Sequence, residues 1–413
     1  MNSWSQVAIP SIDSIIRWPA LILTDSSTGK KAPLESKPVY RMYVCGITPY
    51  DATHLGHAAT YLTFDLINRY LLATGSEVRY VQNITDIDDP LLERAHRDGI
   101  DWKDLAHQQI DLFRGDMVNL RVIPPAHYIG AVDAIPLVTQ AIEQLSTKDS
   151  VYQVDQDLYF KVHADPHFGE RSHLSTEKML EIFSERGGDP TRAGKADPLD
   201  CLVWMSQRPN EPGWPSPFGI GRPGWHIECT AIAIQYLEPA THEAALIDIQ
   251  GGGSDLIFPH HEMCASQAQV LTGKDLAATY VHAAMIGLDG EKMSKSKGNL
   301  VFVSKLIASG TDPMVIRFAL MSQHYRLDRM WTDELLIQAT KRVSDIRKAF
   351  STSSVAPTTP VIDRLVLALS DDLDTPTALA ALDQWAVDTL SGSSGGDAQE
   401  LSVALDALLG LEL

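Results

Sequence analysis

Two histidines and a glycine lie close together in the segment 45–61, "CGITPYDATHLGHAATY", where a predicted strand is followed by a predicted helix. His54 and His57 stand at the expected start of that helix, where backbone N–H groups and the positive helix end favour an anion. Gly56 between them would let a flat base approach the backbone. Two surface histidines on a turn are the alternative, and this motif alone leaves both interpretations open.

A second motif, "EKMSKSKGN" at residues 291–299, carries Lys292, Lys295 and Lys297 among small residues. Such a loop can close over a triphosphate and neutralise its charge as pyrophosphate leaves. A lone lysine cluster is usually a solvated surface. Two such motifs, in this order and on two halves of one α/β pattern, are rarely accidental.

Thiols and imidazoles form a third set, made of Cys45, Cys229 and His260, with Cys264 four residues after His260 on the same helical face. A Cys/Cys/His set on separate elements suits tetrahedral Zn²⁺ with one position left open for a substrate. Any one of these residues could instead be a small buried core residue. Cys201 is read as an ordinary buried thiol.

The elements that must position these residues alternate between strand-like and helix-like patterns. "VYRMYVC" and "EVRYVQNI" are predicted strands on either side of the helical pattern "HAATYLTFDLINRYLLATG", and this βαβ order predicts a parallel sheet. Helices are expected at about 89–120 and 128–144, followed by an antiparallel ribbon in "VYQVDQDLYFKV". The sheet pattern returns in "AALIDIQGGGSD" and "YVHAAMIGLDG" around a helix beginning near His260, and the chain after Gly298 is expected to be helical throughout.

The composition of the 413 residues, 44% hydrophobic and 21% charged, is that of a globular protein. No long apolar run or signal-peptide pattern is present, so we expect a cytoplasmic protein without a membrane partner. The net charge of −19 argues against broad nucleic-acid binding. The residues from 351 onward carry ten acidic side chains against one arginine, Arg364, and should repel RNA.

The HLGH and KMSKS motifs together resemble the signatures of class I aminoacyl-tRNA synthetases, and the resemblance covers roughly residues 39–320. It implies an α/β fold: a Rossmann-like catalytic domain split by a connective insert and followed by a helical C-terminal region. The predicted divisions are an N-terminal extension (1–37), the first catalytic half (38–145), the connective insert (146–222), the second catalytic half with the KMSKS loop (223–300), a helical stem-contact-like domain (301–350), and a linker with a small acidic helical domain (351–413).

The thiol and imidazole set resembles the zinc site of cysteinyl-tRNA synthetases, in which the substrate thiolate fills the open position. Apolar packing alone would separate cysteine from serine only weakly, whereas a Zn²⁺–thiolate bond strongly prefers sulfur. The resemblance implies Cys45, Cys229 and His260 as ligands of one zinc ion. In that family a glutamate matches Cys264, so Cys264 could either bind the metal or pack beside it.

The same resemblance implies roles for further residues. His54, His57, Lys292 and Lys295 would stabilise the transferred phosphate, and Mg²⁺ would accompany ATP. Trp225 would cover the amino-acid pocket, Asp255 would supply negative charge for the ribose or the cysteine ammonium, and Ile286 would pack near adenine. The residues implied to line the cysteine and the adenylate are Cys45, Gly46, Ile47, Thr48, Thr60, Asn83, Ile84, Thr85, Trp225, Gly253, Ser254, Asp255 and Ile286.

Three features resemble the ligases of mycothiol biosynthesis, which join L-cysteine to the amine of 1D-myo-inositol 2-amino-2-deoxy-α-D-glucopyranoside (GlcN-Ins). These are the short acidic region after Gly298, the wording "CGITPYDATHLGHA", and "ERGGDP" at residues 185–190. The resemblance implies a monomeric ligase that uses ATP, L-cysteine and GlcN-Ins and no nucleic acid. Within "ERGGDP", Glu185, Arg186 and Asp189 could bind sugar hydroxyls or form a structural turn.

Two other functions are compatible with the sequence. A truncated cysteinyl-tRNA synthetase would carry out the same adenylation, and the acidic C-terminal region is the feature that argues against it. A catalytically silent synthetase-like binding module is disfavoured by the intact HLGH and KMSKS motifs and the full thiol and imidazole set.

Overall fold

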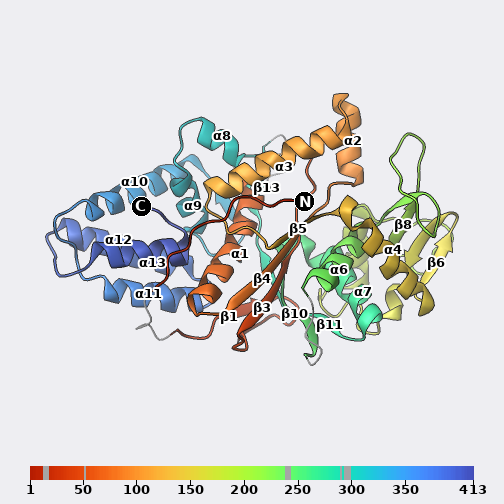
Figure 1. Ribbon diagram of the computed structural model, residues 1–413, viewed down its shortest axis with the longest axis horizontal. Helices are drawn as coiled ribbons and strands as arrows, with labels where there is room; N and C mark the ends of the chain where they lie inside the picture. Colours follow the sequence, from red (N-terminus) through yellow and green to blue (C-terminus); the bar gives the residue numbers. More distant parts are fainter. Residues whose placement is uncertain (13–17, 51–52, 238–242, 289–290, 293–298) are drawn as a thin grey trace.

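A five-stranded parallel sheet forms the centre of the molecule, with strand order β11-β10-β3-β4-β5 (Figure 1). The computed structural model describes residues 1–12, 18–50, 53–237, 243–288, 291–292 and 299–413. The strands are β3 (Val39–Val44), β4 (Glu77–Ile84), β5 (His127–Gly130), β10 (Ala245–Gly253) and β11 (Asp275–Ala283). The chain runs outward in opposite directions from β3, so the topological switch point lies between β3 and β10, where α/β sheets bind their ligands.

Helices cover both faces of this sheet, as the alternating pattern predicts. Around the sheet lie α1 (Leu55–Ala73), α2 (Asp89–Asp98), α3 (Trp102–Asn119), α4 (Ala131–Thr147), α6 (Trp225–Tyr236) and α7 (Glu262–Thr272). Most residues of α1 are buried, because the helix is packed between the sheet and the C-terminal helices (Figure 1). A helix enclosed in this way is mostly apolar, and its buried polar side chains need partners within the protein.

The segment expected to interrupt the catalytic domain forms its own antiparallel sheet, at the right of Figure 1. Its strands are β6 (Val151–Val154), β7 (Asp157–Phe160), β8 (Cys201–Ser206) and β9 (Gly221–Pro223), in that order across the sheet. A short 3-10 helix (Val162–Ala164) and α5 (Thr176–Glu185) lie between β7 and β8. The predicted ribbon in "VYQVDQDLYFKV" is confirmed as the β6–β7 hairpin.

The C-terminal part is mainly helical and packs against α1 and α3. It comprises α8 (Val303–Ala308), α9 (Pro313–Met321), α10 (Asp333–Phe350), α11 (Thr359–Ser370), α12 (Thr375–Leu390) and α13 (Ala398–Leu409). A small sheet of β12 (Ile286–Leu288), β13 (Glu291–Lys292) and β14 (Arg329–Trp331) joins it to the catalytic part, and an N-terminal hairpin of β1 (Ile22–Asp25) and β2 (Lys30–Pro33) lies beside β11.

Two local expectations are wrong in detail. The helix expected from Tyr128 begins at Ala131, because Tyr128 and Ile129 belong to β5, whose four residues are too short for a clear period. The chain after Gly298 is not helical throughout, since β14 pairs in parallel with β12. The helix expected to begin near His260 is confirmed as α7, which begins at Glu262 after a 3-10 turn (Ser254–Leu256) and a π-helical turn (Ile257–His261).

A buried ion network fastens α1 to the C-terminal helices. Asp65 on α1 accepts hydrogen bonds from Arg69 at 2.8 Å and from Arg317 on α9, and all three side chains are fully buried. The same arginines donate to carbonyls near the end of α13: Arg69 to Asp406 at 2.6 Å and Arg317 to Leu409 at 2.6 Å. Arg317 therefore binds a carbonyl in the last turn of α13, where helix carbonyls lack a partner within the helix, whereas Asp406 O also accepts from Gly410 N at 3.0 Å.

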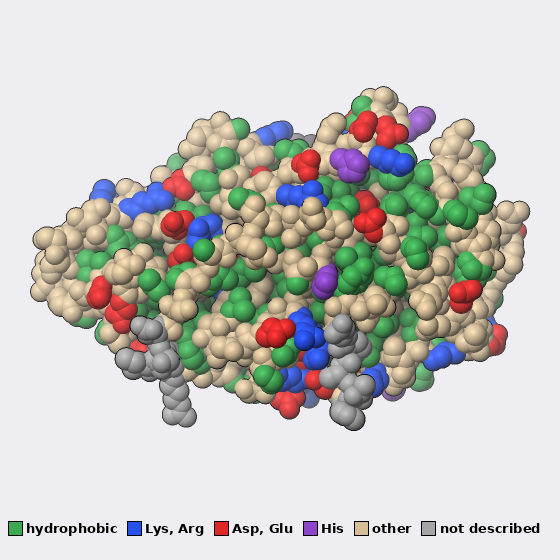
Figure 2. Space-filling view, viewed as in Figure 1, with side chains coloured by type: hydrophobic (Ala, Val, Ile, Leu, Met, Phe, Trp, Pro, Cys, Tyr) green, Lys and Arg blue, Asp and Glu red, His purple; other side chains and the backbone are tan. Residues whose placement is uncertain are grey.

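The surface carries mixed charge. Figure 2 shows Lys and Arg side chains scattered among acidic ones on the face that it presents. In the part of the chain that the structure describes, no helix has both the length and the apolar character that a membrane span requires.

We predict that Arg317→Met destabilises the protein by about 3 kcal/mol, because it leaves the buried carbonyl oxygens of Leu409 and Leu120 without their guanidinium donor and leaves Asp65 with one of its two arginine partners. Urea unfolding would measure the loss. Arg364→Met is the matched control, because Arg364 is exposed on α11, and it should change stability by less than about 0.5 kcal/mol. A loss below about 1 kcal/mol for Arg317→Met would show that the network contributes little to docking.

Candidate active site

The candidate site lies at the carboxyl ends of β3, β4 and β10, on either side of the topological switch point. The turn after β3 is held against β4 by two hydrogen bonds: Gly46 N donates to Asn83 Oδ1 at 2.8 Å, and Thr85 N donates to Ile47 O at 3.0 Å. A Cβ on Gly46 would lie 1.8 Å from the carbonyl oxygen of Asn83. Only glycine allows this approach, so Gly46, Ile47, Asn83, Ile84 and Thr85 are brought together. Thr48 follows in the same turn.

His54 acts as the N-cap of α1. Its Nδ1 accepts hydrogen bonds from Gly56 N at 3.1 Å and His57 N at 3.4 Å. Because Nδ1 is the acceptor, the proton of the neutral ring lies on Nε2, which is directed away from the helix backbone. A Cβ on Gly56 would come within 2.9 Å of the His54 ring. The glycine between the histidines therefore serves the cap itself.

His57 stacks on His54 with ring centroids 3.7 Å apart. Burial, followed by the charge of His54, lowers the pKa of His57 well below its ordinary value. His57 is therefore neutral at physiological pH and can act as a hydrogen-bond donor beside the helix end. One turn further, Thr60 Oγ1 donates to Gly56 O at 3.1 Å.

The KMSKS loop is only partly within the described residues. The backbone of Lys292 belongs to β13, whereas Lys295 and Lys297 lie outside the described residues. The strand before the loop, β12, contacts α1, and Ile286 on it is buried. The segment after the loop pairs with the start of α1: Leu55 N donates to Val301 O at 2.9 Å, and Val303 N donates to Thr53 O at 3.1 Å. Both flanks of the loop thus lie beside the HLGH turn.

Cys45, Cys229 and His260 meet in the buried interior behind this turn. Their ligand atoms all lie within 4.8 Å of one another. The Cys45 and Cys229 sulfurs are 3.9 Å apart, and His260 Nε2 lies 3.3 Å from the Cys229 sulfur. The residues come from the end of β3, from α6 and from the π-helical turn before α7. Among the described residues, this is the one cluster of His, Cys, Asp and Glu side chains close enough to hold a metal ion.

The electrostatics of the trio suit a cation. Burial alone raises the pKa of Cys229, but the hydrogen bond with Cys45 and the charge of His260 bring that pKa well below its ordinary value. Burial alone lowers the pKa of His260, but the charges of Cys264 and Cys229 raise it well above its ordinary value. The trio therefore favours a thiolate beside an imidazolium, and a bound metal ion would replace that proton. Two sulfurs and one imidazole are a donor set that fits a tetrahedral metal with a fourth position open.

His260 is held in place from both ends of its ring. Its Nδ1 lies 3.0 Å from Nδ1 of His226, which leaves Nε2 facing Cys229. The indole of Trp225 stacks on the His260 ring with centroids 4.3 Å apart. Trp225 therefore lies directly beside the cluster.

Cys264 lies next to the cluster but has a different partner. Its sulfur donates to the carbonyl oxygen of His226 at 3.3 Å and is 3.8 Å from His260 Nε2. It is not among the three residues whose ligand atoms converge. This geometry favours packing beside the metal position over ligation.

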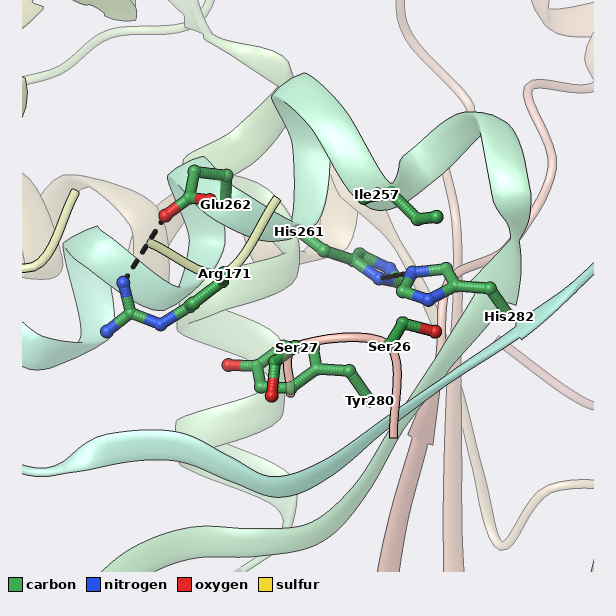
Figure 3. A pocket seen from close by; sticks show the side chains of 8 residues that line it. All are labelled: Ser26, Ser27, Arg171, Ile257, His261, Glu262, Tyr280 and His282. Atoms are coloured by element: carbon green, nitrogen blue, oxygen red, sulfur yellow. Dashed lines mark hydrogen bonds and ion pairs between the residues drawn. The ribbon is translucent and has the colours of Figure 1, made fainter. Parts of the chain in front are cut away.

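Two histidines and a glutamine that the sequence reasoning missed stand behind Cys45. The Cys45 sulfur lies 3.3 Å from His261 Nε2 and 3.4 Å from Gln250 Nε2, and His261 Nδ1 lies 2.7 Å from His282 Nε2. Figure 3 shows His261 and His282 side by side at a cavity of about 10 Å³, which has room for no more than about one water molecule. His261 could have been noticed in "PHHE", but Gln250 and His282 lie on strands whose contact only the fold reveals.

The loop after β10 presents Asp255 toward α1. A Cβ on Gly253 would lie 2.5 Å from Oδ1 of Asp255 and 3.9 Å from Oγ1 of Thr60, so the carboxylate lies over Gly253 and near the first turns of α1. Ser254 and Asp255 are both partly exposed. No described residue donates a hydrogen bond to the Asp255 carboxylate, which leaves it available for a cationic or hydroxylated ligand.

The three residues of "ERGGDP" do not converge on a common pocket. Glu185 is exposed at the end of α5. Arg186 Nη1 donates to the carbonyl oxygens of Asp255 and Phe258. Asp189 accepts from the hydroxyl of Tyr159 and from Lys195 at 3.0 Å. Arg186 and Asp189 are thus engaged within the protein.

Known proteins match this chain over its whole length. A family model described as the class I tRNA synthetase (C) catalytic domain matches residues 31–341. Proteins named L-cysteine:1D-myo-inositol 2-amino-2-deoxy-alpha-D-glucopyranoside ligase are 54% identical in Thermomonospora curvata and 55% in Kribbella flavida, covering all of both chains in each case. The protein of the same name from Mycolicibacterium smegmatis is 52% identical, again with full coverage of both chains.

Solved structures show the same fold. Methionyl-tRNA synthetase from Mycobacterium tuberculosis, bound by methionyl-adenylate, aligns with a TM-score of 0.61 at 16% identity and covers 91% of this chain and 92% of its own. A putative arginyl-tRNA synthetase from Campylobacter jejuni aligns with a TM-score of 0.54 at 11% identity, covering 92% of this chain and 91% of its own. The chain belongs to the class I tRNA synthetase family, within the group of full-length relatives that are named as cysteine ligases.

Proposed function

We propose that this protein is an ATP-dependent ligase that joins L-cysteine to the amine of GlcN-Ins through a cysteinyl-adenylate, with release of pyrophosphate and AMP. The observation that carries the proposal is the buried approach of Cys45, Cys229 and His260 directly behind the HLGH turn. Full-length relatives named for this reaction support the choice of acceptor. The enzyme acts as a cytoplasmic monomer in mycothiol biosynthesis.

Cysteine binds with its side chain toward the cluster. Cys45, Cys229 and His260 would hold one Zn²⁺, which when bound prefers a thiolate to a hydroxyl and so selects cysteine over serine. Trp225, stacked on His260, covers this pocket. The Asp255 carboxylate pairs with the cysteine ammonium, because it is partly exposed at the edge of the same site.

Adenylation takes place at the start of α1. The cysteine carboxylate attacks the α-phosphorus of ATP, and pyrophosphate leaves. His54, through Nε2–H, and His57 donate hydrogen bonds to the phosphate oxygens at the positive end of the helix. Lys292 and Lys295 neutralise the leaving pyrophosphate, and Mg²⁺ accompanies the nucleotide. Gly46 to Thr48 and Asn83 to Thr85 line the adenylate, with Ile286 near adenine.

The amine of GlcN-Ins then attacks the activated carbonyl, forms the amide and expels AMP. The acceptor enters beside the connective part of the chain, where Glu185 is exposed. A cysteinyl-tRNA synthetase activity is the second candidate, because it shares the adenylation step. The full-length relatives and the acidic C-terminal region favour the amino sugar.

The reaction is tested in two steps. Cysteine-dependent exchange of pyrophosphate into ATP is expected with zinc-loaded protein, and serine is expected to support little exchange. AMP release should then follow the addition of GlcN-Ins and not of tRNA. The absence of cysteine-dependent exchange would reject the ligase, and turnover with tRNA alone would reassign the acceptor.

A metal analysis separates the two interpretations of Cys264. Wild-type protein should hold about one zinc ion per chain, and Cys229→Ala should lose both zinc and exchange activity. Cys264→Ala should keep its zinc, because the Cys264 thiol donates a hydrogen bond to a backbone carbonyl. Cys201→Ala is the control, because Cys201 is buried near Gln267 and outside the trio. Loss of zinc from Cys264→Ala would make Cys264 a ligand.

Substitutions of His54 separate its capping role from its catalytic one. His54→Ala removes the acceptor for Gly56 N and His57 N and should cost about 1 kcal/mol of stability, whereas asparagine is a good N-cap and His54→Asn should be nearly neutral. Both variants lose the outward Nε2–H and should slow exchange by about a hundredfold. Unfolding in urea and exchange rates measure the two effects. Full activity in His54→Asn would show that the cap alone matters.

A further inference from the structure

We infer that Arg186, in the "ERGGDP" turn, is a positioning residue that holds the Gly253–Phe258 loop so that Asp255 can receive the cysteine ammonium. The inference rests on the proposed function, because it takes Asp255 as the ammonium partner. It gives the turn a role in the amino-acid site in place of the sugar contact that the sequence also allowed.

The residues of the turn fit this role one by one. Arg186 is the C-cap of α5, and its N–H donates to Ile182 O at 3.1 Å. Gly187 has a φ of +85°, a left-handed conformation that side chains rarely adopt. Gly188 packs flat against the ring of Phe183, where a Cβ would lie 2.5 Å from the ring. These constraints fix the backbone from which the Arg186 side chain reaches the loop after β10.

The far side of the turn is anchored in the sheet of the insert. Asp189 accepts from the Tyr159 hydroxyl, and it pairs with Lys195 at 3.0 Å. Lys195 in turn lies 5.0 Å from the centre of the Phe183 ring and donates to Pro198 O at 2.8 Å. The turn is therefore fixed on both sides of Arg186, and a fixed turn can hold another loop in place.

The target of Arg186 is the backbone of the substrate loop. Nη1 donates to the carbonyl oxygens of both Asp255 and Phe258, which spans the 3-10 turn at Ser254–Leu256 and the beginning of the π-helical turn. α5 also contacts this π-helical turn. Because the guanidinium binds main-chain oxygens, the neighbouring Asp255 carboxylate keeps no ion-pair partner among the described residues.

This arrangement explains how the Arg186 guanidinium can position Asp255 without competing with the cysteine ammonium for its carboxylate. An arginine paired with the Asp255 carboxylate would neutralise it and compete with the ammonium. Arginine bound to the carbonyls instead fixes the direction of the carboxylate, and the Asp255 Oδ1 lies over Gly253 near Thr60. The connective insert and the amino-acid site are thereby joined through one side chain.

The experiment compares Michaelis constants in cysteine-dependent pyrophosphate exchange by the zinc-loaded, full-length protein. In Arg186→Met the KM for cysteine should rise by about tenfold or more, with kcat nearly unchanged. This is the pattern expected when a substitution weakens the binding of the substrate and of the transition state by the same amount. The KM for ATP and the zinc content should stay at their wild-type values. Lys178→Met, on the exposed side of α5, and Arg364→Met, on α11, are matched controls and should behave as wild type.

A double-mutant cycle tests whether Arg186 acts through Asp255. Asp255→Asn should itself raise the KM for cysteine, and adding Arg186→Met to it should raise the KM by less than about twofold more, because coupled residues are not additive. If Arg186→Met does not fold, Arg186→Lys, which retains charge and a donor, provides the same measurements. A cysteine KM within twofold of wild type, an equal rise in both KM values, loss of zinc, or full additivity with Asp255→Asn would each overturn the inference.

The inference and the proposed function fail in different ways. If wild-type protein shows no cysteine-dependent exchange, the proposed function is wrong. If wild-type exchange is normal and Arg186→Met leaves the KM for cysteine unchanged, only the role of Arg186 is wrong.

Discussion

The buried approach of two thiols and an imidazole is the constraint on which the rest of the site depends. Cys45, Cys229 and His260 come from three elements far apart in the chain, and each is less than 5% exposed. Polar groups removed from water must be paired, and here they are paired with one another and with His226, His261 and Gln250. A second layer of this kind fixes ring orientation around a metal position. It also fixes how β3, α6 and the turn before α7 must meet.

The same end of β3 serves phosphate chemistry, because only a few residues separate Cys45 from the start of α1. Close packing at Gly46 lets the turn lie against Asn83 and Thr85, and the His54 cap begins the helix. The segment after the KMSKS loop is hydrogen-bonded to the residues on either side of His54. Amino-acid selection and activation therefore share one short passage of chain, and the C-terminal helices support it through the buried network around Asp65.

Acidic side chains of the C-terminal helices are paired with other residues of the same chain. Asp372 accepts from Tyr325 and Arg326, both at 2.7 Å, Asp383 pairs with Arg342 at 2.6 Å, and Asp406 pairs with Arg121 at 2.5 Å. The Asp406–Arg121 pair joins α13 to the catalytic part, whereas Asp372 and Asp383 join elements within the C-terminal part itself. This pairing is consistent with a C-terminal region that has a structural role and does not bind an anionic polymer such as RNA.

Sequence alone determined the α/β class and the motifs, because each depends on local period, residue type or spacing, and the resemblance to cysteinyl-tRNA synthetases singled out the three residues of the cluster, whose approach only the fold shows. The βαβ order follows from hydrophobic pattern, and the HLGH and KMSKS motifs are contiguous. It did not determine β5 or β14, since three or four residues carry too little periodicity, nor the roles of Gln250 and His282. Tertiary structure decided these strands and contacts. It also decided that the Cys264 thiol donates a hydrogen bond to a carbonyl and that Arg186 binds the loop that carries Asp255. The physical reason is that a side chain's partners across the fold depend on the packing of distant elements, which no local spacing encodes.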